Sequence, residues 1–545
     1  MLPPYKPPAV IVPRLRCEAR DVTRWTSNVT SHAAARRSVR FVPWPCQQLT
    51  VRLRLYHMLH SFAILTLGCK VNRYESQQIR QFLESLGLTQ ADSAQRPQLV
   101  VINTCCVTHI ASAKSRHLIR QAQNHDPEAV VICGCLPTVE TDELHAVGEN
   151  VHVVRNRCDL PATLRRLIDT ESGLPNPIHR VWEPSTAPDA APPGPAQPES
   201  PRHPTDTVIR PESDAKVKCE RDLDESEELP PLVSFRNQTR AFLKVQDGCD
   251  AFCSYCIIPT ARPDVRFKKV EEVHAEAAAL VAAGHKEIVL TGVHLGSYGQ
   301  TTARRHKWET PHNRHLPGLL DGVAQVPGLA RIRLSSLDPA DVTEALLDVF
   351  RSHSNLMPHL HLSLQSGSDA VLRRMARPYT VDEFRAKVAL IRRYLDRPAV
   401  TTDIIVGFPG ETDADFEKTV ALAQEMAFAK MHIFVFSARK GTAAARLQPK
   451  VPAEIKKARS QILRDLDLTL QRDFRAQFLG ETAQILIETT NGHPSGRAER
   501  YFEVQIVRRS DASHKSAPSC SAGEIVTARL QENTADSLLA TALGC

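Results

Sequence analysis

Three cysteines in the segment GCDAFCSYC lie close enough together to bind metal as one group. Cys249, Cys253 and Cys256 follow one another in a C-x3-C-x2-C pattern, directly after an apolar run at 241–245. Three thiolates on one loop can each bind one iron of a cubane cluster, and the fourth iron is then left without a protein ligand. The pattern therefore predicts a cluster with one iron open to a small molecule.

Zinc is the alternative for the same spacing, with a fourth ligand from elsewhere in the chain. The chain contains 14 cysteines, and most of them stand in tight local groups. In a large chain without a clear secretion signal, this grouping favours metal binding in a reducing compartment over a disulfide framework. We therefore expect metal-bound thiolates and a cytoplasmic location.

A second set of cysteines is spread along the chain but shares one position relative to the predicted strands. Cys69, Cys105 and Cys135 each come just after an apolar run has ended. The carboxyl ends of parallel strands meet at one edge of a sheet, where ligands bind, so the three thiols predict a second cluster with an open iron. For any one of them, a buried core cysteine is the alternative. We interpret Cys106 and Cys133 as non-ligands, because they only neighbour this set.

Alternating apolar runs and amphipathic segments predict the elements that position both cysteine sets. Three strands and two helices indicate a small α/β domain with a parallel sheet. Six further strand–helix units suggest a partial or full barrel, with its chemistry at the carboxyl ends of the strands. Short strands between polar turns then predict a small all-β barrel. The predicted strands are 62–67, 99–104, 129–134, 241–245, 287–291, 331–335, 359–364, 401–406, 431–436, 483–488, 501–507 and 524–530, and the predicted helices include 75–86, 270–283, 382–395 and 454–478.

These elements divide the chain into five parts. We assign 58–170 to the N-terminal domain, 234–477 to the core and 478–545 to the C-terminal barrel. The segment 171–233 is rich in proline and then in acids, which predicts a disordered linker. Residues 1–57 hold ten basic and two acidic residues. We interpret them as a disordered or non-native extension, with a basic RNA-binding arm or a transit peptide as the alternatives.

Charge and hydropathy limit the possible partners. The net charge of +7 resides in the N-terminal extension, so the rest of the chain is nearly neutral and any RNA-binding surface must be local. No apolar run approaches the roughly 18 residues of a membrane span. We expect a monomer without a membrane partner.

Several segments together are similar to one known family. TLGCKVNRYES, VVINTCCVTHIASAKSR, VQDGCDAFCSYCIIP, RIRLSSLDP, LHLSLQSGSD and DIIVGFPGETDADF resemble the radical-SAM methylthiotransferases. The KVN after Cys69 resembles the branch that modifies N6-threonylcarbamoyladenosine in tRNA (MtaB-like). The resemblance implies an α/β fold made of an N-terminal parallel-sheet α/β domain, a partial (β/α) radical-SAM barrel and a small C-terminal all-β TRAM-like barrel, the last being the family's RNA-binding module.

The resemblance also implies the cofactors and the residues that hold them. It implies two [4Fe-4S] clusters, one on each cysteine set, and S-adenosyl-L-methionine. An aromatic residue in the cysteine loop and two Gly-rich turns after strands agree with it, although such a turn taken alone could be an ordinary turn. The residues assigned in this way to S-adenosylmethionine are Tyr255, Gly292, Gln365, Ser366, Gly407 and Gly410.

The implied reaction uses S-adenosylmethionine both as methyl donor and as the source of a 5′-deoxyadenosyl radical. A methylthio group then joins C2 of N6-threonylcarbamoyladenosine at position 37 of tRNA. The implied partners are the tRNA anticodon stem-loop and an electron donor such as flavodoxin or ferredoxin. Isopentenyladenosine in tRNA, a ribosomal-protein side chain and a non-catalytic iron–sulfur RNA-binding role are the alternatives. Two positions depart from the family pattern, since Pro263 replaces the usual Gly after Arg262 and Asp338 replaces the usual Glu.

Overall fold

The structure is a computed structural model, and all of its described residues belong to one unit, 56–545. The predicted N-terminal extension and the linker up to residue 228 lie outside the described residues. The described residues are 59–91, 95–140, 144, 148, 150–168, 229–305, 314–490, 493–507 and 520–543.

The N-terminal domain is built on a five-stranded parallel sheet in the order β2-β1-β3-β4-β5. Continuous apolar runs form β3 and β4, which are buried along their whole length, as expected for parallel strands covered on both faces. Alternate residues pack with α1 and α4 on one face and with α2 on the other. The elements are β1 (Ser61–Thr66), α1 (Lys70–Ser85), β2 (Thr89–Gln90), β3 (Leu99–Thr104), α2 (His109–Gln123), β4 (Ala129–Gly134), α3 (Leu136–Val139), β5 (Val151–Val153) and α4 (Leu160–Ile168).

The core contains six parallel strands that form a partial barrel. Strands β6, β8 and β9 pair in one sheet, with β7 antiparallel at its edge, and β10, β11 and β12 pair in another. Two isolated parallel bridges, Ile332 with Leu356 and Leu337 with Leu362, connect the sheets between β9 and β10. The strands are β6 (Arg240–Asp247), β7 (Arg266–Phe267), β8 (Glu287–Gly292), β9 (Arg331–Leu334), β10 (His359–Gln365), β11 (Ala399–Val406) and β12 (Lys430–Val435).

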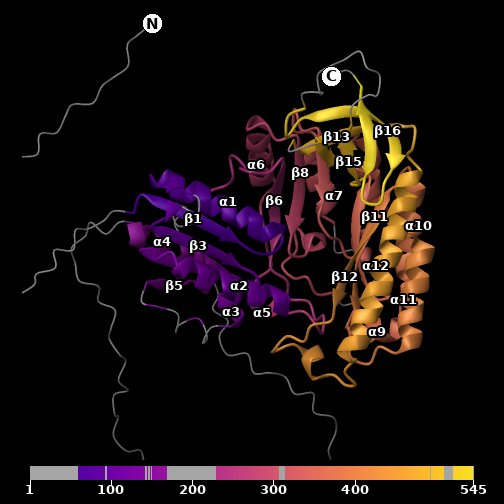
Figure 1. Ribbon diagram of the computed structural model, residues 1–545, viewed down its shortest axis with the longest axis horizontal. Helices are drawn as coiled ribbons and strands as arrows, with labels where there is room; N and C mark the ends of the chain where they lie inside the picture. The colour runs from indigo at the N-terminus through magenta and orange to yellow at the C-terminus, as the bar shows by residue number, and fades with distance from the viewer. Residues whose placement is uncertain are drawn as a thin grey trace, which may run out of the picture. The chain divides into compact units, whose positions relative to one another are not determined.

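Helices follow the strands of the core and cover them on the outside, with α12 lying along β12 and α11 packed against α12 (Figure 1). The interior between the strands and the helices forms one large apolar cluster. The helices are α5 (Ile258–Ala261), α6 (Val270–Ala282), α7 (Leu316–Ala324), α8 (Glu344–Ser352), α9 (Asp369–Arg374), α10 (Val381–Tyr394), α11 (Asp413–Met426) and α12 (Ala453–Ala476).

The C-terminal strands, yellow in Figure 1, close into a barrel in the order β13-β14-β15-β17-β16. Period-two patterns put apolar side chains inside, as in β16, whose residues alternate between buried and exposed. The strands are β13 (Thr482–Thr489), β14 (Ser495–Arg497), β15 (Glu503–Ile506), β16 (Ile525–Asn533) and β17 (Leu538–Ala542).

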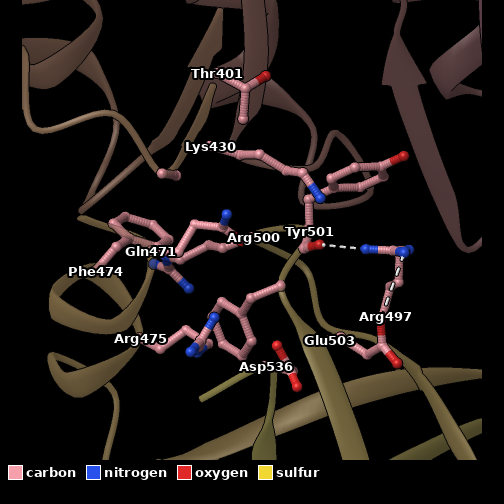
Figure 2. Close-up of a pocket in the computed structure, with 12 residues that line it drawn as sticks. Thr401, Lys430, Gln471, Phe474, Arg475, Arg497, Arg500, Tyr501, Glu503 and Asp536 are labelled. Carbon is pink, nitrogen blue, oxygen red and sulfur yellow. Dashed lines mark hydrogen bonds and ion pairs between the residues drawn. The ribbon is translucent and has the colours of Figure 1, made fainter. Parts of the chain in front are cut away.

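Two buried arginines of β9 attach the C-terminal barrel to the core. Arg331 donates to the backbone oxygen of Gln484 at 2.6 Å, and Arg333 donates to that of Ala498 at 2.8 Å. The ring of Tyr501 lies against Arg333, and Tyr501 lines a small cavity of about 50 Å³. In this cavity Arg497 donates a hydrogen bond to the backbone oxygen of Tyr501 (Figure 2). The attachment therefore relies on charge-assisted hydrogen bonds to carbonyl groups.

The predicted fold class is confirmed. Strands β3 and β4 have the predicted bounds, and each of the six core strands falls within two residues of its prediction. The short strands β2, β5, β7, β14 and β17 were not predicted. Among the described residues, no helix is long and apolar enough to cross a membrane.

Candidate active site

One cavity of about 550 Å³ brings the two predicted cysteine sets together. The N-terminal domain contributes residues that follow β1, β3 and β4, and the core contributes residues at or after the carboxyl ends of its strands. The carboxyl edges of both domains therefore face the same space, where ligands bind in such folds. The six cysteines in its wall are Cys69, Cys105, Cys135, Cys249, Cys253 and Cys256.

The loop that carries the first cysteine set is held at its start and in its middle. Gly248, directly after β6, has a φ of +75°, and a Cβ there would lie 1.8 Å from the backbone oxygen of Asp264, so only glycine fits. In the middle of the loop, the backbone N–H of Ser254 donates to the backbone oxygen of Met375 at 3.0 Å. These contacts fix the backbone of the loop that carries the thiols.

The second set is positioned by tight turns at the edge of the parallel sheet. Gly134 has a φ of +96°, and a Cβ there would lie 2.4 Å from the backbone oxygen of Thr104. Asn72, from the KVN segment, donates to that same oxygen at 2.8 Å. The hydroxyl of Ser115 accepts from the backbone N–H of Cys105 at 3.2 Å. Three strand ends are thus bound into one rigid edge.

Burial changes the protonation of three of these thiols. Burial raises the pKa of Cys105 and of Cys249 to about 11, and that of Cys256 to about 12. Such thiols stay protonated at neutral pH unless a metal takes the place of the proton. Three cysteines in each set are nevertheless the donors that a cubane cluster takes, with iron displacing the thiol protons.

A single zinc ion suits this arrangement poorly. Among the described residues, no three His, Cys, Asp or Glu side chains converge to hold one metal ion, as the zinc alternative requires. In a cubane cluster each thiolate binds a different iron, so the three sulfur atoms do not have to reach one shared ion.

Each cysteine set has one sulfur in contact with a buried arginine. Arg377 donates to the sulfur of Cys253 at 3.2 Å, and Arg262 donates to that of Cys135 at 3.4 Å. Arg377 is also paired with Asp338 at 2.6 Å. Burial alone would raise the pKa of Asp338, but Arg377 and a hydrogen bond with His294 lower it to about 2. Asp338 is therefore ionised at every working pH.

Three of the residues predicted to bind S-adenosylmethionine line the cavity. They are Tyr255 in the cysteine loop, Gly292 at the end of β8 and Gln365 at the end of β10. Gln365 has a left-handed φ of +68°, a conformation that costs about 1–3 kcal/mol for a non-glycine residue and is concentrated at functional sites. This backbone strain supports a functional role for the Gln365 side chain.

The other three do not line the cavity, and their contacts are structural. Ser366 accepts from the backbone N–H of Ser368 at 3.3 Å. Gly407 and Gly410 have φ values of +72° and +79°, and the N–H of Gly407 donates to the Glu411 carboxylate at 3.0 Å. Their assignment to the cofactor stays a prediction without a contact in its favour.

The two neighbouring cysteines lie outside the cavity wall, as expected for bystanders. Cys133 packs in the apolar core on one face of the sheet, and Cys106 packs on the other with its sulfur 3.3 Å from the backbone oxygen of Cys135.

Replacing either Cys106 or Cys133 by alanine is expected to leave about eight irons per chain and to cost about 1–2 kcal/mol of stability through a small cavity. Iron analysis after anaerobic reconstitution measures this, and a loss of about four irons would identify the replaced residue as a ligand.

Several residues of the cavity wall were not predicted. Lys70 and Asp403 line it, and His294 lies in the TGVHLGS segment. The sequence departures can also be located in the structure: Asp338 pairs with Arg377, and Pro263 disfavours a helical backbone at Arg262, the C-cap residue of α5. For His294, its position shortly after a predicted strand was the one feature of the sequence that could have indicated a place in the cavity wall.

Comparison with known proteins agrees with this geometry. Residues 243–423 match the Radical SAM superfamily, and residues 61–155 match the uncharacterized protein family UPF0004. The two matched regions are those that supply the two cysteine sets.

Two relatives and one solved structure illustrate the range of similarity. The threonylcarbamoyladenosine tRNA methylthiotransferase MtaB of Bacillus subtilis is 34% identical over 428 residues, which are 78% of this chain and 84% of that protein. The tRNA-2-methylthio-N(6)-dimethylallyladenosine synthase of Pelotomaculum thermopropionicum is 28% identical, over 80% of this chain and 89% of that protein. A radical S-adenosylmethionine methyltransferase from Kitasatospora setae has a TM-score of 0.44 at 15% identity, covering 69% of this chain and 72% of that chain.

Proposed function

Since the chain belongs to the radical-SAM methylthiotransferase family, in its MtaB-like branch, we propose that it adds a methylthio group to C2 of N6-threonylcarbamoyladenosine at position 37 of tRNA. The MtaB-type relatives are 31–34% identical over most of the chain, against 28–30% for the dimethylallyladenosine synthases. This difference favours the threonylcarbamoyl substrate.

The observation that carries the proposal is the single cavity that both cysteine sets line. Methylthiolation joins a sulfur-bound methyl group to an unreactive aromatic carbon, so the group that carries the sulfur and the group that activates the carbon must face one substrate. A two-domain enzyme meets this requirement only if both groups open into the same space.

The family uses S-adenosylmethionine and [4Fe-4S] clusters, and when bound they supply the radical and sulfur chemistry that amino-acid side chains cannot. The residues of this chain hold and orient them. Cys249, Cys253 and Cys256 hold the radical cluster, and we assign S-adenosylmethionine to the wall beside them, with Gln365 as a hydrogen-bonding group and Tyr255 as an apolar surface. Cys69, Cys105 and Cys135 hold the second cluster.

The buried charges of the cavity wall are paired with one another. Asp338 is paired with Arg377 and lies 3.6 Å from His294, so that its negative charge is compensated inside the cavity. The proposed substrate is a base in the anticodon stem-loop, because single-stranded loops allow bases to turn outward. An electron donor such as flavodoxin or ferredoxin supplies the electron.

The test is nucleoside analysis of tRNA from a host that lacks its own MtaB-type enzyme. We expect 2-methylthio-N6-threonylcarbamoyladenosine to appear when the full chain is expressed. The chain with Cys249 replaced by alanine is the matched control and should yield only the unthiolated nucleoside.

Each alternative has its own signature in the same experiment. Thiolated isopentenyladenosine would assign the chain to the other tRNA branch, and a mass increase on a ribosomal protein without a change in tRNA would assign it to the ribosomal-protein branch. Absence of any product, together with absence of 5′-deoxyadenosine, would contradict enzymatic activity.

A further inference from the structure

Arg262 connects the two halves of the site. It follows the radical-SAM cysteine loop in the core, yet its Nε donates to the sulfur of Cys135 in the N-terminal domain at 3.4 Å. The remaining nitrogens of the guanidinium form a fork on the carboxylate of Glu75 in α1, at 2.8 and 2.9 Å, and one of them also donates to Asp247 at 2.7 Å. The Arg262 side chain is only 3% exposed, so these contacts are shielded from water.

The charges around this arginine do not cancel. Arg157 lies 3.4 Å from Glu75 and donates to the sulfur of Cys135 at 3.6 Å, and Lys244 pairs with Glu75 at 3.2 Å and with Asp247 at 2.8 Å. Together with Arg262 the group contains three cations and two carboxylates. A net charge of +1 therefore lies against one ligand sulfur of the second cluster.

The carboxylates in this group are ionised. Burial alone would raise the pKa of Glu75, but Arg157, Arg262 and Lys244 lower it to about 2. Asp247 forms ion pairs with Arg262 at 2.7 Å and with Lys244 at 2.8 Å, so it counts as the second carboxylate of the group. Replacing Glu75 by glutamine consequently removes one negative charge and retains an oxygen that accepts from Arg262.

The radical-cluster site has a different balance. Arg377 donates to the sulfur of Cys253 at 3.2 Å, but its charge is paired one-to-one with Asp338 at 2.6 Å. The sulfur of Cys253 thus contacts a one-to-one ion pair, whereas the sulfur of Cys135 contacts a group with one more cation than carboxylates. Since hydrogen bonds to sulfur and net charge are major determinants of cluster potential, the two clusters are tuned differently.

We propose that Arg262 is a positioning residue that raises the reduction potential of the cluster held by Cys69, Cys105 and Cys135. A cation that donates to a ligand sulfur stabilises the one-electron-reduced cluster, which is more negative by one charge than the oxidised cluster. The inference rests on the proposed function, because it requires that these three cysteines hold a cluster.

The test is an anaerobic redox titration with dithionite, followed by EPR, of the reconstituted full chain. Alanine at Cys249, Cys253 and Cys256 provides a background in which the second cluster alone is observed. In R262Q we expect the ratio of reduced to oxidised cluster at a fixed potential to fall about tenfold, a shift of about 59 mV to more negative potential for a one-electron couple. In R262K, which keeps the charge but loses the fork, the shift is smaller.

Glu75 provides a control of opposite sign. E75Q leaves Arg262 in place and makes the surrounding charge more positive, so the potential rises in E75Q and falls in R262Q. A merely structural role would disturb the cluster in the same direction in both variants. If R262Q does not retain four irons, R157Q takes its place, with a smaller fall because Arg157 is 28% exposed and lies 3.6 Å from the sulfur.

The outcomes separate this inference from the proposed function. Four irons in the background variant with an unchanged potential in R262Q would overturn the role of Arg262, and so would a shift of the same sign in R262Q and E75Q. Absence of any cluster in the background variant would instead overturn the ligand assignment on which the proposed function depends. R377Q, measured in the chain with both clusters, should shift only the radical cluster.

Discussion

Replacing Cys249, Cys253 and Cys256 together by alanine is expected to remove about four of eight irons per chain and to abolish formation of 5′-deoxyadenosine. The three thiols line the cavity at the end of β6, and no other described residue of that loop offers a soft ligand for iron. Without the cluster the rate falls by at least about a million-fold, to the uncatalysed level. Iron analysis and chromatography of S-adenosylmethionine products after anaerobic reduction measure both effects.

The matched control is C520A. Cys520 is buried in the C-terminal barrel and does not line the cavity, so this variant removes a buried thiol without touching the site. It should keep about eight irons and full cleavage of S-adenosylmethionine. If the triple variant still formed 5′-deoxyadenosine, the radical cluster would have to lie elsewhere in the chain.

Two strands that carry the site were predictable because each begins with an uninterrupted run of apolar residues. LVVINT and AVVICG became β3 and β4 with the predicted bounds. Strands β2 and β7 were not predictable, because two residues are too few to show a period. The predicted strand at 501–507 starts two residues too early, since Tyr501 has a left-handed φ of +71° that no strand accommodates.

Composition alone did not locate the C-terminal boundary of the predicted linker. Residues 229–233 belong to it by proline content, yet they pack against α1 in the structure. Leu232 is fully buried, and Gln78 and Gln81 of α1 donate to the backbone oxygens of Pro230 and Pro231. A proline-rich segment can therefore be ordered where a helix provides donors for its carbonyl groups.

The common location of the six cysteines was predictable for a different reason than their surroundings. Their positions after successive strands follow from the parallel topology, which local sequence reveals. The contacts of Arg262 join residues 187 and 127 positions apart, and no local pattern predicts such pairs. The same holds for Arg377, which reaches the sulfur of Cys253 from 124 residues away. The charges around each cysteine set therefore follow from the fold and cannot be deduced from local sequence.

Replacing Cys69, Cys105 and Cys135 together by alanine is expected to abolish methylthio transfer while some cleavage of S-adenosylmethionine continues. The two cysteine sets come from different domains, and most of each domain's apolar core consists of its own residues, so losing one cluster need not unfold the site of the other. With the sulfur-carrying group gone, the radical chemistry becomes uncoupled from product. Nucleoside analysis should show no methylthiolated adenosine, and 5′-deoxyadenosine should still be detected.

The bystander variant C133A is the control for this last experiment, because Cys133 lies in the same domain one strand position before the edge and outside the cavity wall. It should retain transfer and about eight irons, whereas the triple variant should retain about four. Methylthiolated tRNA from the triple variant at the rate of the unmodified chain would show that the N-terminal cysteines do not carry the transferred sulfur. Loss of both products with all iron gone would show instead that the two domains do not assemble their clusters independently.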